Sequence, residues 1–182
     1  KFANKGSALC TSCIAGKAGL GNISACEECA AGQYRTNSMV STRCTKCPRG
    51  FSQQDTGQTS CLPCTPGEFS DILGATKCKL CINSTYFDKK KGNTSCIKCP
   101  TGWSSDDGSA KCQQCGAGTY GYGCRSCPIG FARSSSNTDS TKCQRCKRGE
   151  TTSRIRSATC EKCDLGKFGK IEGECLACHA GT

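Results

Sequence analysis

Large apolar residues are few along this chain, and they recur singly, without helical periodicity. Leu, Ile, Val and Phe together number 22 of the 182 residues. A charged chain with so few large apolar side chains cannot bury enough surface to offset the entropy of ordering. No apolar stretch approaches the length of a membrane span. The hydrophobic pattern therefore predicts a chain that needs covalent support.

Cysteine supplies a regular frame for the sparse apolar positions. All 22 cysteines lie in C-x-x-C pairs, with a mean spacing near 17 residues from one pair to the next. A short chain with more than roughly 8–10 % Cys is usually a disulfide scaffold, and the fixed period indicates an internal repeat. The pairs begin at Cys10, Cys26, Cys44, Cys61, Cys78, Cys96, Cys112, Cys124, Cys143, Cys160 and Cys175.

Glycine and an aromatic residue follow each pair at fixed distances. Gly stands three residues after the second cysteine in ten of the eleven units, and Ser84 is the exception. The aromatic comes five residues after that cysteine at Tyr34, Phe69, Tyr86, Tyr120 and Phe168, and four after it at Phe51, Trp103 and Phe131. Glycine supplies backbone conformations with positive φ. We expect each aromatic to form the miniature core of its unit.

Turn signals between the pairs predict one short hairpin per unit. Asp107-Gly108 is typical of a type I′ turn, and Thr56-Gly57 and Lys91-Gly92 are weaker turn sites. The predicted fold class is small and disulfide-rich, with tandem short irregular β-hairpin units stacked into an elongated rod and almost no helix. Each unit is expected to touch mainly its neighbours.

We predict one continuous array over residues 1–182, with about ten cysteine-rich repeats. Because the chain starts at Lys1 and stops part-way into a further unit at "CLACHAGT", we expect a fragment of a longer chain. The units lie near 10–26, 26–44, 44–61, 61–78, 78–96, 96–112, 112–124, 124–143, 143–160 and 160–175.

Three chemistries use C-x-x-C pairs: zinc binding, thiol redox reactions and disulfide cross-linking. Two pairs 12–20 residues apart can form a four-cysteine zinc site, but eleven pairs cannot all be matched in twos. The single histidine, His179, adds little ligand choice. Thioredoxin-like chemistry needs one pair at a helix start, which eleven copies do not fit. We therefore expect disulfides, with no metal and no cofactor.

Sequons point to the same compartment as the cysteines. Three N-x-S/T sequences without Pro occur, at Asn22, Asn83 and Asn93, and each could accept a glycan in a secreted protein. Together with the cysteines they predict an oxidised, extracellular or cell-surface glycoprotein.

The runs "CPRGFSQQDTGQTSCLPC" and "CIKCPTGWSSDDGSAKCQQC" resemble the ephrin-receptor-like cysteine-rich repeats of extracellular proteins. The single loop is also similar to the first submodule of tumour necrosis factor receptor repeats, a Cys-x-x-Gly-x-Tyr hairpin closed by one disulfide. The likeness extends from Cys10 to Gly181. It departs at the short segment from Cys115 to Cys124, at Ser84, and after Cys146, where the aromatic is missing.

The sequence alone leaves the cysteine connectivity open. The resemblance implies that the second cysteine of each pair bonds to the first of the next, which leaves Cys10 and Cys178 for partners beyond the ends. The implied bonds are Cys13–Cys26, Cys29–Cys44, Cys47–Cys61, Cys64–Cys78, Cys81–Cys96, Cys99–Cys112, Cys115–Cys124, Cys127–Cys143, Cys146–Cys160 and Cys163–Cys175.

The net charge of +11 adds a candidate patch for an acidic ligand such as a polysaccharide. The chain is not expected to bind nucleic acid, because the aromatics are too evenly spaced for a base-stacking platform. With one histidine, a catalytic triad is not expected either, and we predict no enzyme activity. The patch consists of Lys142, Arg145, Lys147, Arg148, Arg154 and Arg156.

Two hypotheses about function follow. In the first, the repeats form the stem or wall of a non-enzymatic extracellular fibre, coat or appendage, by analogy with flagellar hairs, and assemble with themselves. In the alternative, they form a receptor or adhesion ectodomain that binds a protein or acidic glycan, with the irregular units 112–124 and 143–160 as candidate binding regions. An antigenic protozoan surface coat is a third hypothesis.

Overall fold

The computed structural model describes residues 13–19, 26–38, 43–88 and 92–179. In this part of the chain all regular structure is short β-strand, and no residue is helical. The strands form ten two-stranded sheets, each between consecutive strands. The pairing is antiparallel, as where Phe51 lies opposite Pro63 and Trp103 opposite Gln114. The predicted class of disulfide-rich β-hairpin repeats is therefore confirmed.

We number the hairpins 1 to 10 along the chain. Hairpins 1 to 5 are β1 (Lys17–Gly19) with β2 (Cys26–Glu28), β3 (Gln33–Tyr34) with β4 (Thr45–Lys46), β5 (Phe51–Ser52) with β6 (Leu62–Pro63), β7 (Glu68–Phe69) with β8 (Lys79–Leu80), and β9 (Thr85–Tyr86) with β10 (Ile97–Lys98). Hairpins 6 to 10 are β11 (Trp103–Ser104) with β12 (Gln113–Gln114), β13 (Thr119–Tyr120) with β14 (Arg125–Ser126), β15 (Phe131–Ala132) with β16 (Gln144–Arg145), β17 (Glu150–Thr151) with β18 (Glu161–Lys162), and β19 (Lys167–Phe168) with β20 (Leu176–Ala177).

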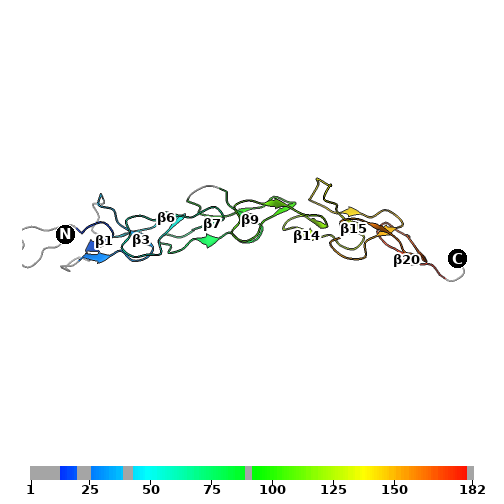
Figure 1. The fold of residues 1–182 in the computed structure, drawn as a ribbon, viewed down its shortest axis with the longest axis horizontal. Helices are drawn as coiled ribbons and strands as arrows, with labels where there is room; N and C mark the ends of the chain where they lie inside the picture. Colours follow the sequence, from blue (N-terminus) through cyan, green and yellow to red (C-terminus); the bar gives the residue numbers. More distant parts are fainter. Residues whose placement is uncertain (1–12, 20–25, 39–42, 89–91, 180–182) are drawn as a thin grey trace, which may run out of the picture. The chain divides into compact units, whose positions relative to one another are not determined.

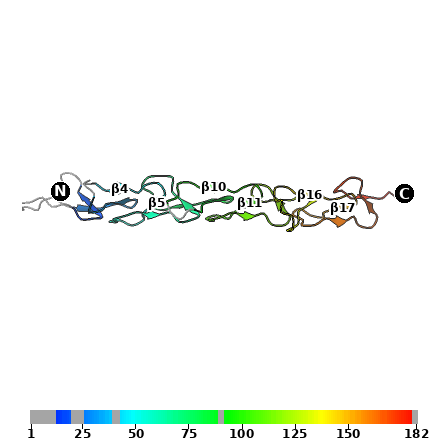
Figure 2. The same ribbon diagram turned by 90° about the horizontal axis from the view of Figure 1, so that it is seen from above.

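The chain falls into two compact units. The first comprises Lys1–Cys81, Tyr86–Ile97 and Gly108–Ala110, and the second comprises Ile82–Thr85, Lys98–Asp107 and Lys111–Thr182. Within each unit, taken by itself, the hairpins follow one another in chain order (Figures 1 and 2). The expectation of one continuous array remains a prediction.

Ten disulfides close the ten hairpins, five in each unit. They join the pairs that the resemblance implies, from Cys13–Cys26 to Cys163–Cys175, with Cα–Cα distances of 5.2 to 5.9 Å. The joined cysteines lie 9 to 16 residues apart in sequence. Closing a loop of about 15 residues stabilises a fold by roughly 3 kcal/mol, which here takes the place of a large apolar core.

Sulfur and small polar side chains fill the interior. The second cysteines of nine pairs, from Cys13 to Cys146, are at most 8 % exposed. The other buried apolar residues of the described chain are alanines: Ala18, Ala75 and Ala132. The buried polar residues are Arg35, Gln53, Ser70, Ser84, Asn93, Ser105, Thr119, Arg133, Ser140 and Thr152.

The expectation that the aromatics form the cores is wrong. None of the repeat aromatics is buried, and Trp103 and Phe168 are 39 % and 44 % exposed. Each aromatic instead begins or ends the first strand of its hairpin, on a two-residue sheet too small to cover a ring. Phe69 and Phe131 lie under the cationic side chains that face them across the hairpin, with Lys79 Nζ 5.9 Å and Arg145 Cζ 5.7 Å from the ring centres.

In most of the described repeats the glycine links its hairpin to the next two, so the expectation of contacts mainly between neighbours is incomplete. The N–H of Gly32 donates to Gln53 O at 2.6 Å in the next hairpin. Gly32 O accepts from Cys47 N at 2.9 Å. The missing side chain of Gly32 leaves room for the backbone of Gly74, two hairpins ahead. Positive φ, +79° at Gly32, turns both polar groups toward the following hairpin.

Ser84 occupies the glycine position of hairpin 5 with a φ of +61°. Its hydroxyl contacts Ser104 Oγ at 3.0 Å and donates to Asn83 Oδ1 at 2.7 Å. The residue facing it two hairpins ahead is Gly123, where an added methyl group would lie 3.3 Å from Ser84 Oγ. The two sequence departures, Ser84 and the short hairpin 7, thus meet at one place, where the glycine makes room for the serine hydroxyl.

Candidate interaction site: a groove that recurs along the repeats

The same groove recurs at equivalent positions of three hairpin pairs. Groove 1–2 has a volume of about 300 Å³, groove 3–4 about 600 Å³ and groove 8–9 about 350 Å³. Each is lined by the fifth residue after the second cysteine of one hairpin, and by the two residues between the cysteines of the next pair. The first and fourth residues after that pair also line it, as do the first cysteine of the following pair and the residue before that cysteine. The repeat backbone therefore builds one frame for different side chains.

The side chains in this frame differ between the three grooves. Groove 1–2 presents the carboxylates of Glu27 and Glu28, with Lys17 Nζ 3.6 Å from Glu28 Oε1. Groove 3–4 presents Leu62 and Pro63, and Leu62 is 61 % exposed. Arg43 also lines groove 1–2, and Glu68 and Lys77 also line groove 3–4, so the first lining has two carboxylates and one cation and the second is partly apolar with one charge of each sign.

Groove 8–9 is the one that receives part of the expected basic patch. Arg145 and Lys147 line it together with Glu150, Ser134 and Thr159. The Arg145 guanidinium is held over the Phe131 ring. The two cations of this groove can pair with an acidic group of a ligand. The carboxylate of Glu150 can accept a hydrogen bond from a donor beside that group.

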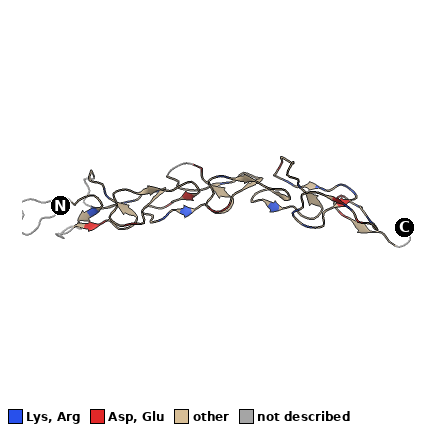
Figure 3. Ribbon diagram, in the orientation of Figure 1, with Lys and Arg blue, Asp and Glu red and all other residues tan. Residues whose placement is uncertain are grey.

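The remaining members of the predicted patch do not line groove 8–9. Lys142 Nζ lies 3.8 Å from Asp139 Oδ2, and Arg148 Nε donates to Gly169 O at 3.0 Å. Arg154 is exposed. Arg156 is exposed, adopts a φ of +62° in a turn and donates its backbone N–H to Cys127 O. Basic and acidic residues are interspersed within each unit (Figure 3). The structure thus gathers Arg145 and Lys147 in one groove, rather than the six residues in one patch.

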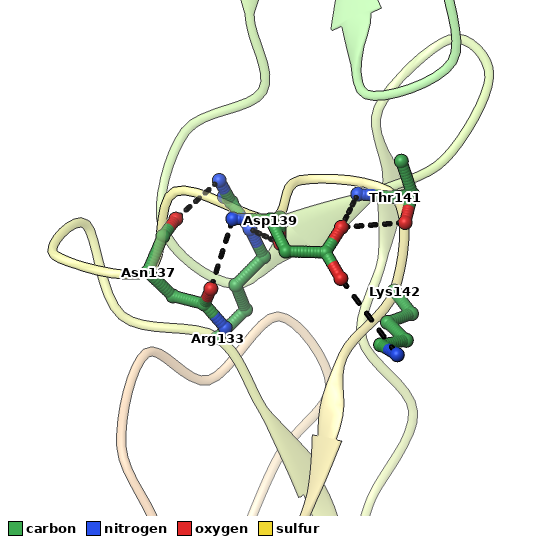
Figure 4. A network of polar contacts seen from close by, with 5 residues as sticks. All are labelled: Arg133, Asn137, Asp139, Thr141 and Lys142. Atoms are coloured by element: carbon green, nitrogen blue, oxygen red, sulfur yellow. Dashed lines mark hydrogen bonds and ion pairs between the residues drawn. The ribbon is translucent and has the colours of Figure 1, made fainter.

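A hydrogen-bonded loop of hairpin 8 lies in sequence between Ser134 and Gln144, which both line this groove (Figure 4). Asp139 Oδ1 accepts from Thr141 N at 2.9 Å and from Thr141 Oγ1 at 2.5 Å. The Asp139 N–H donates to Asn137 Oδ1 at 3.0 Å. The hydroxyl and N–H of Thr141, followed by Lys142 and Arg133, hold the pKa of Asp139 below its ordinary value. The carboxylate therefore stabilises the loop in its ionised form.

Two buried arginines organise the backbone, and sequence reasoning missed them. Arg133, 3 % exposed, donates from Nη1 to the carbonyls of Cys115 and Gly116, both at 2.9 Å, and from Nε to Asp139 O at 3.0 Å. Arg35, 5 % exposed, makes the equivalent bonds to Cys13 O at 2.9 Å and Ile14 O at 3.1 Å. Both stand six residues after a second cysteine. Other units have Gln53, Ser70, Ser105 and Thr152 there, so no single residue type marks the position.

The candidate sequons fall in different environments. Asn83 is exposed, Asn93 is 1 % exposed, and Asn22 lies outside the described residues. Cys10 also lies outside them, and Cys178 is exposed and has no disulfide within the described part. Among residues 13–19, 26–38, 43–88 and 92–179, no three His, Cys, Asp or Glu side chains are grouped for metal binding. The same part of the chain has no helix that could cross a bilayer.

Comparison with known proteins places these hairpins among extracellular modules. The family model described as "Tyrosine-protein kinase ephrin type A/B receptor-like" matches residues 39–81 and 67–106. "Signal peptide, CUB and EGF-like domain-containing protein 2" of Mus musculus is 31 % identical over 142 residues, with 59 % of this chain and 14 % of the relative covered. The protein of the same name from Homo sapiens is 30 % identical over 140 residues, with 58 % and 14 % covered.

The chain spans 14 % of the length of these curated relatives. The matches are to receptor-like extracellular cysteine-rich domains rather than to enzyme families. Together with the ten disulfides, these matches indicate that the chain is extracellular. Residues 39–106 are thus ephrin-receptor-like cysteine-rich repeats, as their sequence pattern indicates.

Proposed function

We propose that this chain is part of the ectodomain of a receptor-like or adhesion protein, and that its repeats bind a protein partner through the recurring groove. The observation that carries the proposal is the constant frame with a changing lining in grooves 1–2, 3–4 and 8–9. Such a frame presents different chemistry at equivalent positions of the repeat, which suits selection among partners. The family match and the similarity to CUB- and EGF-containing proteins support an ectodomain.

Groove 8–9 is the part of the array that we expect to contribute most to partner selection. Arg145 and Lys147 lie on its wall with exposed side chains. The Phe131 ring restrains the Arg145 guanidinium, which reduces the entropy lost on binding. Charged groups of this kind raise association rates and exclude partners of the same sign. The proposed partner therefore carries an acidic surface segment.

The test is a binding screen of the native, unreduced chain against an array of purified extracellular proteins, with sulfated and carboxylated polysaccharides as additional probes. Each hit is measured again with Arg145→Ala/Lys147→Ala and with Leu62→Ala, which lies in groove 3–4. Lys170→Ala is the matched control, because Lys170 is exposed and lies outside the three grooves.

We expect a protein ligand whose affinity falls at least tenfold in Arg145→Ala/Lys147→Ala, equivalent to 1.4 kcal/mol, and is unchanged in Lys170→Ala. If the chain binds polysaccharides and no protein, the partner is an acidic glycan and the proposed protein partner is wrong. An array without any ligand, or hits insensitive to all groove variants, would contradict the proposal.

Self-assembly into a fibre is the second candidate function. The observation that favours it is the exposure of large apolar side chains directly after the second cysteines, such as Ile14 at 68 % and Ile82 at 70 %. Lateral packing of copies would remove this surface from water. A fibre would bury these tips, whereas an ectodomain would leave them exposed in single copies.

A further inference from the structure

We propose that Asn83 carries an N-linked glycan in the folded protein, whereas Asn93, the other described sequon, is a structural amide that remains unmodified. Both sequons are complete: Asn83-Ser84-Thr85 and Asn93-Thr94-Ser95. They lie in the same hairpin, so compartment and chain context do not distinguish them. The difference lies in what each carboxamide does in the structure.

Asn93 uses both hydrogens of its amide. Nδ2 donates to Thr65 O at 3.1 Å and to Glu68 O at 2.9 Å, so it bonds hairpin 5 to hairpin 4. The residue is 1 % exposed. A sugar on Nδ2 would replace one of these hydrogens and would need space that the neighbouring hairpin fills. A chain modified at Asn93 therefore cannot adopt this packing.

Asn83 presents the opposite arrangement. The residue is exposed, and its backbone N–H donates to Asp107 Oδ1 at 2.6 Å. Its Oδ1 accepts from the Ser84 hydroxyl at 2.7 Å, and no hydrogen bond of the described structure uses its Nδ2. The backbone and the carbonyl oxygen are thus fixed, while the amide nitrogen is left available.

The surroundings of Asn83 suit a glycan. Ile82, the preceding residue, is 70 % exposed, and a bulky hydrophilic group beside it would shield this apolar side chain. The hydroxyl of Ser84, which replaces the repeat glycine, is held by Ser104 and orients the Asn83 carboxamide. The departure from the repeat therefore supports the modification site.

The modification is a group transfer from an oligosaccharide carried on a polyprenyl diphosphate. The bond from sugar C1 to the diphosphate oxygen breaks, and the bond from Asn83 Nδ2 to C1 forms. The diphosphate carrier leaves with the electron pair, and one amide proton passes to a base of the transferase.

The experiment is site-resolved mass spectrometry of the chain secreted from a eukaryotic host. After reduction, trypsin separates residues 80–89, with Asn83, from residues 92–98, with Asn93, and Asn22 falls in another peptide. We expect glycan on 80–89 and none on 92–98. Thr85→Ala should remove the mass of one glycan, while Thr85→Ser, which retains the sequon, should restore it.

Two controls isolate the role of burial. Ser95→Ala removes the Asn93 sequon at an exposed residue and should leave the mass of the attached glycan unchanged. Cys81→Ser/Cys96→Ser opens hairpin 5, and glycan should then appear on 92–98 in the retained chain. An unmodified Asn83, a glycan on Asn93 in the secreted wild type, or no rise at Asn93 in the opened hairpin would each overturn the proposal.

Discussion

A methyl group added to Gly32 would lie 2.9 Å from the carbonyl carbon of Gly74, two hairpins farther along the chain. The same relationship joins Gly16 to Gly57 and Gly50 to Gly92 in the first unit, and Gly130 to Gly173 in the second. Successive hairpins are therefore interleaved rather than merely stacked. At these four positions the absent side chain of the glycine is part of the packing, in addition to its role in the turn.

Three glycine-to-alanine variants separate these two roles. Gly32 has positive φ and a close neighbour, Gly166 has positive φ with open space around it, and Gly116 has neither constraint. We expect Gly116→Ala to change stability by less than about 0.5 kcal/mol and Gly166→Ala to destabilise by about 1–2 kcal/mol. Gly32→Ala should destabilise more, because the Gly74 backbone must also move.

Denaturant unfolding with the disulfides intact measures this series. Equal midpoints for Gly32→Ala and Gly166→Ala would show that contact across two hairpins contributes nothing. A large effect of Gly116→Ala would show that the glycines act through the unfolded chain instead.

Arg133→Lys tests the buried guanidinium. An ammonium is a compact point charge and cannot reproduce the planar donor fork that serves the carbonyls of Cys115, Gly116 and Asp139. We expect a loss of about 3 kcal/mol, typical of a disrupted buried charged group. Arg125→Lys, at an exposed position, should change stability by less than about 0.5 kcal/mol. Similar unfolding midpoints for the two variants would contradict the assigned role.

Asn93→Asp tests the structural amide without reference to sugar. The carboxylate would face two carbonyl oxygens, Thr65 O and Glu68 O, and both would lose the hydrogen bond from the amide. We expect a loss of about 3 kcal/mol and earlier proteolysis of hairpin 5. Ser95→Ala, which also removes the sequon, should unfold like the wild type, and an equally stable Asn93→Asp would contradict the assignment.

Asp139 makes the loop of hairpin 8 sensitive to acid. Its pKa in the folded protein is depressed chiefly by the hydrogen bond from the Thr141 hydroxyl. Its contribution is therefore fully present above the ordinary carboxyl pKa of about 3.9 and is lost as the pH falls through the depressed value. Carbon NMR of the carboxylate should show a midpoint below that of an unfolded peptide. Thr141→Ala should raise the pKa and Thr141→Ser should keep it low, whereas a pKa independent of residue 141 would contradict this cause.

The sequence predicts the disulfide frame and the hairpins because cysteine and glycine have few substitutes in these roles. It does not predict the interleaving, since Gly32 and Gly74 contact one another through backbone, which carries no signal in residue type. The buried position of Arg35 and Arg133 is hidden for a related reason. The side chain at this position donates to backbone carbonyls. An amide or a hydroxyl can also do so, as the bonds from Asn93 and Ser105 show.

Of the six residues of the expected basic patch, Arg145 and Lys147 line one groove. Nearness in sequence places Arg145 and Lys147 in one groove because both flank the same cysteine. Lys142 and Arg148 are equally near in sequence but are engaged by Asp139 and Gly169 O. Because each hairpin of about 17 residues contains several turns, side chains only a few positions apart in sequence lie in different turns and have different neighbours. Charge clustering along the chain is therefore a weak guide to a surface patch.

The central claim is that these repeats form a binding ectodomain rather than a self-assembling fibre. Its most direct test is sedimentation of the native, unreduced chain over a wide concentration range, followed by negative-stain electron microscopy of the same samples. The account predicts single copies of 19.1 kDa plus glycan at every concentration. Ordered filaments that form from the native chain and disperse in Ile14→Ser/Ile82→Ser would contradict it and would establish the fibre instead.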